Sequence, residues 1–402
     1  MLQLSFVNFN PNSYILVEGA PVKDHFFIIQ SGTVNCFHSV PIPGSVPTNL
    51  GPGDFVGVIP CMSGHSQTEN VVAKTPVVAI MVKKEQYPEL IMKNTPVAMK
   101  IVRAFANSMR QLNDNLTKLT TNKISVESSE QLFTIADYYH TAGFNDIAVY
   151  GYYQYMKQCP GGVNIQKAKQ RFIALKQNSK AVYFEPSQDL LRNYPAGTMI
   201  FSEFQTGADM FIIQEGSVKI TKVVDGKEVT LALLKKGDMF GEMALLENKP
   251  RSASAIAQDG CKLMTVNHAN FDQMVTSQPV MISKLTTMLA ERLWSMYRQL
   301  SNTQLNGVHE RIVDMIALQI EKKKIAPVRG QPYETGLTMK DIISLCSFDL
   351  KQQSEAMNVI YNEPNMKLEN NKITIPDVGE LIKQADFYRK QYNKRSNNEQ
   401  QN

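Results

Sequence analysis

The stretch of this chain best equipped for ligand chemistry is 237–254, which joins a glycine, a carboxylate and an arginine. Gly241 lets the backbone approach a ligand closely, Glu242 follows it directly, and Arg251 stands nine positions after Glu242. A short helix between them would direct free backbone N–H groups at an anion, and the arginine would add donors suited to phosphate oxygens. An ionised carboxylate only accepts hydrogen bonds, so beside a phosphate it suits a sugar hydroxyl. The spacing predicts a ligand in which one phosphate and one ribose hydroxyl lie close together.

Short strands must hold this segment in place, because β-branched and aromatic residues alternate with turn formers on both sides of it. The predicted strands are Ile200-Phe201, Met210 to Ile213, Val218 to Val223, Val229 to Leu234 and Leu263 to Val266. Asp225-Gly226 lies between two of them and is a strong hairpin signal, since glycine accepts a positive φ without steric cost. These elements predict a β-roll around the segment.

A long helix is predicted after the strands, because apolar residues recur there at three- and four-residue steps. They are Met281, Leu285, Leu289, Leu293, Met296 and Leu300. Together they form one apolar stripe along a helix of roughly 25 residues. Such a stripe needs a partner, and pairing with a second copy of the chain is the commonest solution. We therefore expect a homodimer, with packing of the helix against its own domain as the alternative.

The chain also contains an internal repeat with a spacing of 184 residues. The stretch from Phe27 to Gly32 recurs as Phe211 to Gly216, and Gly57 recurs as Gly241. The same offset holds without a gap between these points, so two copies of one domain are predicted.

The segment 237–254, with the strands before it and the helix after it, closely resembles the phosphate-binding cassette of cyclic-nucleotide-binding domains. The resemblance implies that Glu242 takes the ribose 2′-hydroxyl and Arg251 the cyclic phosphate. It also implies contacts from their neighbours, Phe240, Gly241, Met243, Ala244, Ser252 and Ala253. cAMP is the expected ligand, and cGMP is the alternative.

The first copy lacks the charged residues of this cassette. At the fixed offset Val58 replaces the glutamate, Gln67 replaces the arginine and Thr68 takes the place of Ser252. A phosphate without the arginine loses its strongest contact. The first roll is therefore predicted to be structural or to bind something other than a cyclic nucleotide.

The resemblance extends to the Crp/Fnr regulator family in the long helix and the hinge after it, Leu289 to Leu293 and Val308 to Val313. In that family a Thr-Ser pair on this helix contacts the base. Met296 and Tyr297 occupy those positions here, and they are the candidate base contacts. The resemblance implies that the helix is the dimerisation helix.

The C-terminal part resembles the winged helix-turn-helix of the same regulators, in which a second helix enters the major groove. The matching segment, 348–357, lacks the family's arginines, and Leu350 and Glu355 stand in their place. The candidate DNA contacts that remain are Lys351, Gln352 and Gln353. From residue 308 onward the sequence contains fourteen Lys and Arg and thirteen Asp and Glu. A module with so little net charge is a poor phosphate binder.

The predicted fold class is α+β, with two double-stranded β-helix (jelly-roll-like) domains and a C-terminal winged-helix-like domain. A helical insert between the rolls has small-against-aromatic spacing similar to a tetratricopeptide hairpin, as at Ala136, Tyr139 and Tyr152. We interpret it as a spacer, with a peptide-binding surface as the alternative. The predicted boundaries are 1–120 for the degenerate first roll, 121–180 for the insert, 181–278 for the second roll, 279–307 for the long helix, 308–388 for the degenerate winged helix and 389–402 for a mobile polar tail.

Composition limits the functional class. With 402 residues, 43% of them hydrophobic and 20% charged, the chain is long enough for two to four globular domains. Its net charge of +5 is too diffuse to indicate nucleic acid by itself. The five cysteines lie far apart, which favours reduced thiols, and the first residues of the sequence do not resemble a signal peptide. We therefore expect a cytoplasmic location and no membrane partner. The six histidines lie singly, and we expect no enzyme, no metal and no cofactor.

The leading functional hypothesis is a Crp/Fnr-type sensor of a cyclic nucleotide that regulates transcription through its C-terminal winged helix. Ligand binding would favour one placement of the long helix and so shift the C-terminal module between states. The alternative is a regulatory protein that no longer binds DNA and acts on a protein partner through the insert or the C-terminal module.

Overall fold

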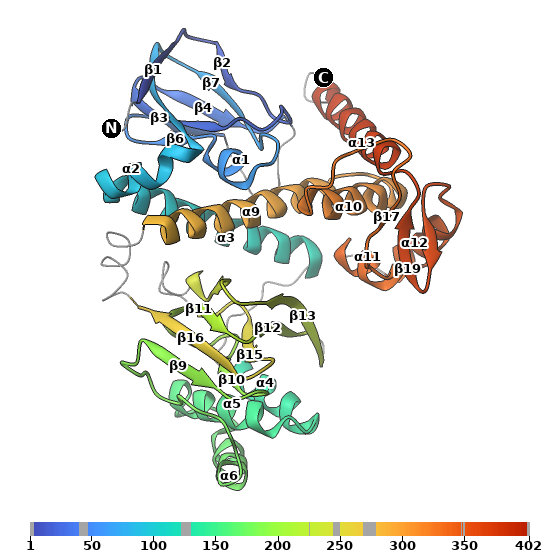
Figure 1. Cartoon of the computed structure of the whole chain (residues 1–402). Helices are drawn as coiled ribbons and strands as arrows, with labels where there is room; N and C mark the ends of the chain where they lie inside the picture. The colour runs from blue at the N-terminus through green and yellow to red at the C-terminus, as the bar shows by residue number, and fades with distance from the viewer. Residues whose placement is uncertain are drawn as a thin grey trace. The chain divides into compact units, whose positions relative to one another are not determined.

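The structure is a computed structural model that describes residues 4–39, 47–121, 130–224, 226–243, 250–267, 279–346, 348 and 350–399. The chain divides into two compact units (Figure 1). One unit joins Met1–Ile124 to Val280–Asn402, and the other is Ser125–Pro279. Each unit contains one β-barrel.

The barrel of the first unit consists of two antiparallel four-stranded sheets, ordered β1-β8-β3-β6 and β2-β7-β4-β5. The strands are β1 (Ser5–Phe9), β2 (Tyr14–Leu16), β3 (His25–Ser31), β4 (Val34–Phe37), β5 (Thr48–Leu50), β6 (Phe55–Val56), β7 (Asn70–Ala73) and β8 (Val77–Lys83). Alternating residues of both sheets fill the space between them, among them Phe27, Ile29 and Val71. The helical elements that follow the strands or lie between them are α1 (Val58–Ser63), η1 (Lys84–Gln86), α2 (Tyr87–Lys93) and α3 (Thr95–Thr121).

The second unit repeats this topology. Its sheets have the orders β9-β16-β11-β14 and β10-β15-β12-β13, which match the first barrel strand for strand. The strands are β9 (Leu191–Tyr194), β10 (Met199–Phe201), β11 (Met210–Glu215), β12 (Val218–Val224), β13 (Lys227–Leu234), β14 (Met239–Phe240), β15 (Ser254–Ala257) and β16 (Cys261–Val266). The predicted strands and the hairpin at Gly226, whose φ is +70°, are confirmed, while Asp225 lies outside the described residues.

The 184-residue offset continues past the barrels. Helix α3 begins at Thr95, and the long helix α9 (Pro279–Thr303) begins 184 positions later. The repeated unit is therefore a barrel followed by a long helix. The predicted helix after the second copy is confirmed with a length of 25 residues.

The insert forms three helices, α4 (Gln131–Thr141), α5 (Asn145–Gln158) and α6 (Ile165–Lys176), where the sequence predicted a helical hairpin. Small residues let α4 and α5 pack closely: a Cβ added at Gly151 would lie 2.9 Å from the Cβ of Ala136. Aromatic side chains, including Tyr139, Tyr152 and Tyr155, are buried in the core that these helices share with the second barrel.

The apolar stripe of α9 is buried within the first unit. Ile282, Leu285, Leu289, Leu293 and Leu300 are all inaccessible to solvent there. The hydroxyl of Tyr87 on α2 lies 3.0 Å from that of Thr286, and His65 stacks on Trp294 with ring centroids 3.8 Å apart. The stripe therefore packs against elements of the first copy, whereas the alternative interpretation expected the domain that precedes the helix to cover it. The homodimer stays a prediction, and the apolar stripe of α9 no longer supports it.

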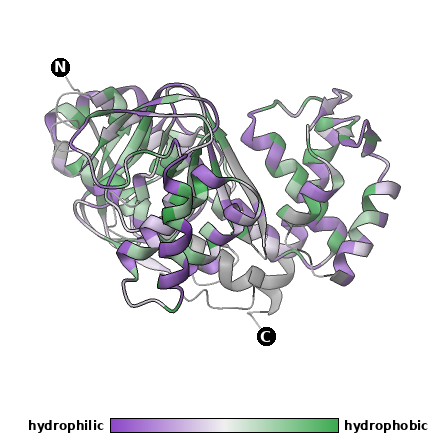
Figure 2. Ribbon diagram, turned by 90° about the horizontal axis from the view of Figure 1, so that it is seen from below, coloured by the Kyte–Doolittle hydropathy of each residue, from purple (hydrophilic) through white to green (hydrophobic). Residues whose placement is uncertain are grey.

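The C-terminal module follows α9. It contains α10 (Val308–Lys322), β17 (Tyr333–Glu334), α11 (Met339–Leu345), α12 (Leu350–Asn362), β18 (Lys367–Glu369), β19 (Lys372–Ile375) and α13 (Val378–Glu399). The strands form one three-stranded sheet, in the order β17-β19-β18. Asn370 and Asn371, both with positive φ, make the predicted turn between two strands. Figure 2 shows hydrophilic and hydrophobic residues alternating along the helices, which have one face in a core.

The segment predicted as a polar tail from residue 389 is helical as far as the structure describes it. Helix α13 continues through this region to Glu399. Arg389 holds it in place, because its guanidinium contacts the carboxylates of Asp314 (2.6 Å) and Glu321 (3.1 Å) on α10. No helix among the described residues is long and apolar enough to cross a membrane.

Candidate functional site

In the second barrel the predicted ligand residues lie at the ends of two strands. β14 ends at Phe240, and Gly241 then turns the chain with a φ of +76° so that Glu242 begins a helical turn. Arg251 is fixed by two backbone bonds to a facing loop: its N–H donates to the carbonyl of Gln205, and its carbonyl accepts from the N–H of Phe204, both at 2.9 Å. These bonds orient the arginine side chain toward Gly241.

The guanidinium of Arg251 is buried, with 6% of the residue exposed. Its Nη1 donates to the carbonyl of Gly241 at 2.8 Å, and the group lies over the ring of Phe201 at 4.1 Å. Its Nε is buried and has no hydrogen-bond partner among the described residues. Burial lowers the pKa of Arg251 to about 10, and the nearby charge of Asp209 opposes that effect. The side chain therefore remains a cation at neutral pH, with unused donor capacity.

Two glycines make room for this cation. A Cβ at Gly241 would lie 2.8 Å from Nη1 of Arg251, and one at Gly207 would lie 3.2 Å from Nη2. The sequence predicted the role of Gly241 but not that of Gly207. The signal for Gly207 was absent, because its importance depends on a side chain 44 positions away.

Glu242 is 1% exposed and lies close enough to Arg251 to interact with its charge. The structure therefore brings together the predicted carboxylate and the predicted arginine. Phe240 is buried in an aromatic cluster of the barrel core, with its ring centroid 5.3 Å from that of Phe211. Ser252 is exposed and Ala253 is buried. Met243 is half-buried, whereas Ala244 lies outside the described residues.

Sequence reasoning missed the residues that support the arginine. Arg192 pairs with Asp209 at 3.0 Å, beside the cation. The side-chain amide of Gln205 donates to the hydroxyl of Tyr150 at 3.1 Å, and Tyr150 belongs to α5 of the insert. Burial raises the pKa of Tyr150 to about 12, so the hydroxyl stays neutral. The insert therefore contacts the loop that positions Arg251.

In the first barrel Gly57 keeps the left-handed conformation of Gly241, with a φ of +77°. Gln67 takes the place of Arg251 and makes a similar pair of backbone bonds: its N–H donates to Ala20 (3.0 Å) and its carbonyl accepts from Gly19 (2.9 Å). The two cassettes thus have matching backbones and different side chains.

The candidate base contacts lie on α9, in the first unit. Tyr297 lines a cavity of the first barrel, where its ring is 5.5 Å from that of His38. Met296 is half-buried on the same helix. Their role toward a nucleotide in the second barrel stays a prediction.

The candidate DNA contacts lie on α12. Lys351 is exposed and Gln352 is half-buried. The amide nitrogen of Gln353 donates to the carbonyl of Phe348 at 2.9 Å, so in this structure it is used within the module.

Comparison with known proteins finds two copies of one domain in the chain. Residues 6–94 and 191–278 match the family model of the cyclic nucleotide-binding domain. Both barrels match one domain family. Its two segments coincide with the two predicted copies.

The matching relatives are cyclic AMP-dependent regulators by name. The cyclic AMP receptor protein of Thermus thermophilus is 35% identical over 25% of this chain and 48% of its own length, so the chain spans about half of that protein. The cAMP-activated global transcriptional regulator CRP of Pasteurella multocida is 29% identical over 38% of this chain and 73% of its length. A CRP-like regulator of Mycobacterium tuberculosis is 25% identical over 48% and 87%.

Similar solved structures include CprK in complex with OCPA, at a TM-score of 0.37 and 16% identity, covering 48% of this chain and 87% of that one. The regulatory domain of Toxoplasma gondii PKA with cAMP covers 71% and 86%, at a TM-score of 0.22 and 16% identity.

Proposed function

We propose that this chain is a cyclic-nucleotide sensor of the Crp/Fnr type, with cAMP as its expected ligand at the second barrel and cGMP as the alternative. The observation that carries the proposal is the buried guanidinium of Arg251, which has donors to spare and Glu242 beside it. A buried donor without a partner is costly, and a cyclic phosphate offers both an acceptor for Nε of Arg251 and an opposite charge. Glu242 then accepts from the ribose 2′-hydroxyl.

The proposed output is regulation of transcription through the C-terminal module. The relatives named as transcriptional regulators support it, and the match to the mycobacterial regulator covers 87% of that protein. In this proposal the ligand favours one of two placements of the helices between barrel and module, and differential affinity shifts their populations.

A second candidate output is a protein partner, which the surface of α12 favours. Met357 and Tyr361 are 42% and 69% exposed and lie one turn apart on that helix. Glu355 and Asn358 are exposed beside them, and Lys351 is the basic residue at the start of the helix. Exposed apolar side chains next to a carboxylate suit a protein surface better than a phosphate backbone.

Isothermal titration calorimetry with cAMP and cGMP tests the sensor. The intact chain is expected to bind one nucleotide, and Arg251→Ala to lose roughly a hundredfold in affinity, because a buried charge contact is removed. Arg103→Ala is the control, since that arginine is exposed on α3 in the first unit. Wild-type protein that binds neither nucleotide at micromolar concentrations would refute the proposal.

Gel-shift titration with genomic fragments, with and without cAMP, separates the two outputs. Transcriptional regulation predicts ligand-dependent and salt-sensitive binding to DNA. Failure to bind under all conditions, together with cAMP binding in the calorimeter, favours the protein partner.

A further inference from the structure

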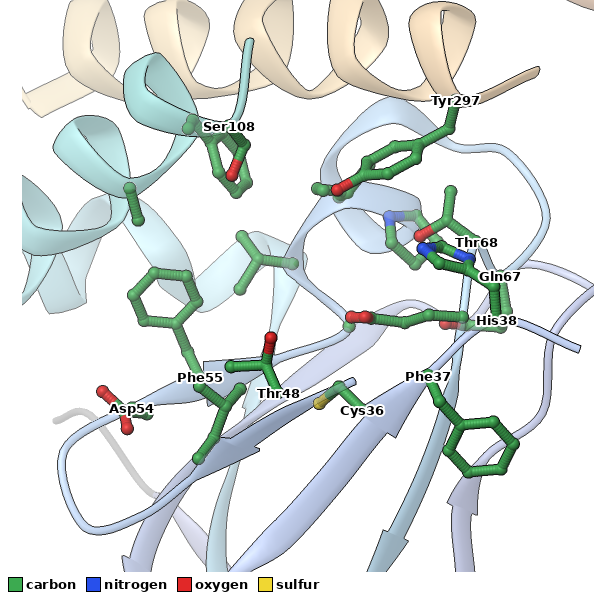
Figure 3. Close-up of a pocket in the computed structure, with 18 of the residues that line it drawn as sticks. Cys36, Phe37, His38, Thr48, Asp54, Phe55, Gln67, Thr68, Ser108 and Tyr297 are labelled. Atoms are coloured by element: carbon green, nitrogen blue, oxygen red, sulfur yellow. The ribbon is translucent and has the colours of Figure 1, made fainter. Parts of the chain in front are cut away.

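The first barrel contains a cavity of about 650 Å³ at the place of its altered cassette. Strand β4, the cassette loop, α3 and α9 all contribute to its lining (Figure 3). Tyr297 enters from α9 and points its hydroxyl into the space, and Ser108 faces it from α3 (Figure 3). The size is that of a pocket for a drug-sized molecule.

Two buried polar groups at this cavity have no hydrogen-bond partner among the described residues. Gln67 is 4% exposed, and its amide nitrogen has no hydrogen-bond partner in the described part of the chain. Nδ1 of His38 is also buried and makes no hydrogen bond to the residues that the structure describes; the Glu18 carboxylate lies 3.9 Å from it. A buried donor without a partner costs about 1–3 kcal/mol, and a bound ligand removes that cost.

The charges around the cavity disfavour an anion. Lys100 on α3 is paired with Asp54 at 2.8 Å. Glu69 lines the cavity, and Glu18 lies behind His38. Burial raises the pKa of Glu69, and His38 opposes this, so a ligand that donates to Glu69 would favour its ionised form. Within the described lining the charges of Lys100 and Asp54 cancel, so Glu69 is the acidic group left to accept a ligand's donors.

We propose that this cavity is a second ligand site that takes a neutral or cationic small molecule with N–H or O–H donors and rejects phosphates. Glu69 accepts the ligand's donors, Gln67 supplies an amide donor, and Tyr297 covers the ligand from α9. The proposal stands apart from phosphate binding at Arg251, because every residue that lines this cavity belongs to the first unit and Arg251 and Glu242 belong to the second.

Fluorescence titration of the full chain tests this site with two probes, adenosine as a neutral donor and agmatine as a cation. Trp294 is the one tryptophan of the sequence and lies one helical turn before Tyr297, stacked on His65. A saturable change in its emission is expected with at least one probe. The change should persist with cAMP at saturation, because cAMP occupies the other site.

Two substitutions decide which chemistry binds. Glu69→Gln is expected to weaken agmatine binding about tenfold or more, because it removes the charge but keeps the shape. Glu85→Gln is the matched control: it makes the same change at an exposed position of η1. Gln67→Arg is expected to abolish the agmatine response, since it places a second cation in the cavity. Thermal melts of each variant check that the fold is kept.

The outcomes are clear in either direction. A response to agmatine alone identifies a cationic ligand, and a response to adenosine alone identifies a neutral one. No saturable response to either probe at millimolar concentrations overturns the proposal. A cAMP stoichiometry of two per chain also overturns it, because the first barrel would then accept the anion.

Discussion

The environment of Arg251 favours the binding of an anion more than it stabilises the unliganded protein. Its guanidinium is buried against Phe201, and one of its donors bonds a backbone carbonyl instead of a carboxylate. Burial lowers its pKa to about 10, which expresses the cost of keeping the charge out of water. A residue held in this way is expected where an anion completes the arrangement.

Replacement of Arg251 with methionine should therefore separate binding from stability. Arg251→Met is expected to weaken cAMP binding roughly a hundredfold while the thermal midpoint of the unliganded protein changes by at most a few degrees, because the desolvation cost of the buried cation offsets its attraction to Asp209 and Glu242. Differential scanning fluorimetry with and without cAMP measures both effects. A midpoint lowered by many degrees without ligand would show that the arginine is structural.

A substitution at Gly241 should impair ligand binding through a clash with Arg251, and this effect can be separated from backbone strain. Gly241→Ala adds a Cβ 2.8 Å from Nη1 of Arg251 at a φ of +76°. Gly226→Ala, at a φ of +70° with nothing within 4 Å, has the same backbone strain without the clash. Both should lose about 1–2 kcal/mol of unfolding free energy from the strained φ. Only Gly241→Ala should also lose cAMP affinity, as calorimetry would reveal, and equal affinities would contradict this.

At the scale of elements, the insert is more than a spacer in this structure. Helix α5 presents Tyr150 to Gln205, and Gln158 accepts from the backbone N–H of Thr206 at 2.8 Å. The loop so held is the one whose carbonyl fixes the backbone of Arg251. Movement of α5 and occupancy of the site should therefore be coupled.

The contact can be tested with Tyr150→Phe, which removes one hydroxyl and leaves the ring. We expect cAMP affinity to fall severalfold and stability to fall by about 1 kcal/mol, since the half-buried amide of Gln205 loses its acceptor. Tyr152→Phe is the control on the same helix, because its hydroxyl bonds Asp137 within the insert at 3.0 Å. If both variants bind cAMP alike, the insert does not support the site.

The local elements could be predicted from the sequence, because strand alternation and helical periodicity are short-range signals. The strands of the second barrel and the stripe of α9 are confirmed for this reason. The cavity at Gln67 and the position of Tyr297 depend on residues more than 200 positions apart, which no local pattern records. The sequence did not predict the helix through residue 389 for the same reason, since the partner of Arg389, Asp314, lies 75 positions earlier.

At the scale of the whole molecule, α9 joins the first barrel to the C-terminal module through a buried charge cluster. Asp314 on α10 is 1% exposed and accepts from Arg298 of α9 (3.1 Å) and Arg389 of α13 (2.6 Å). Asn302 donates to its second oxygen at 2.9 Å. One carboxylate thus fixes three helices, so its ionisation decides how firmly the module is attached to α9.

This cluster predicts acid sensitivity of the first unit. Burial alone would raise the pKa of Asp314, but Arg298 and Arg389 outweigh it and lower the pKa to about 2 from an ordinary value of 3.8. A carboxylate with a depressed pKa contributes stability above its ordinary pKa and loses it as the pH falls toward the depressed value.

The unfolding free energy should therefore decrease between about pH 4 and pH 2, as urea titration followed by Trp294 emission would show. Asp314→Asn should flatten this dependence and cost about 3 kcal/mol at neutral pH, because Arg298 and Arg389 lose their buried carboxylate partner and keep only the more exposed ones such as Glu321. Asp386→Asn, at a half-exposed carboxylate that also contacts Arg389, should cost less than about 1 kcal/mol and keep the slope. An unchanged slope in Asp314→Asn would assign the acid sensitivity to other carboxylates.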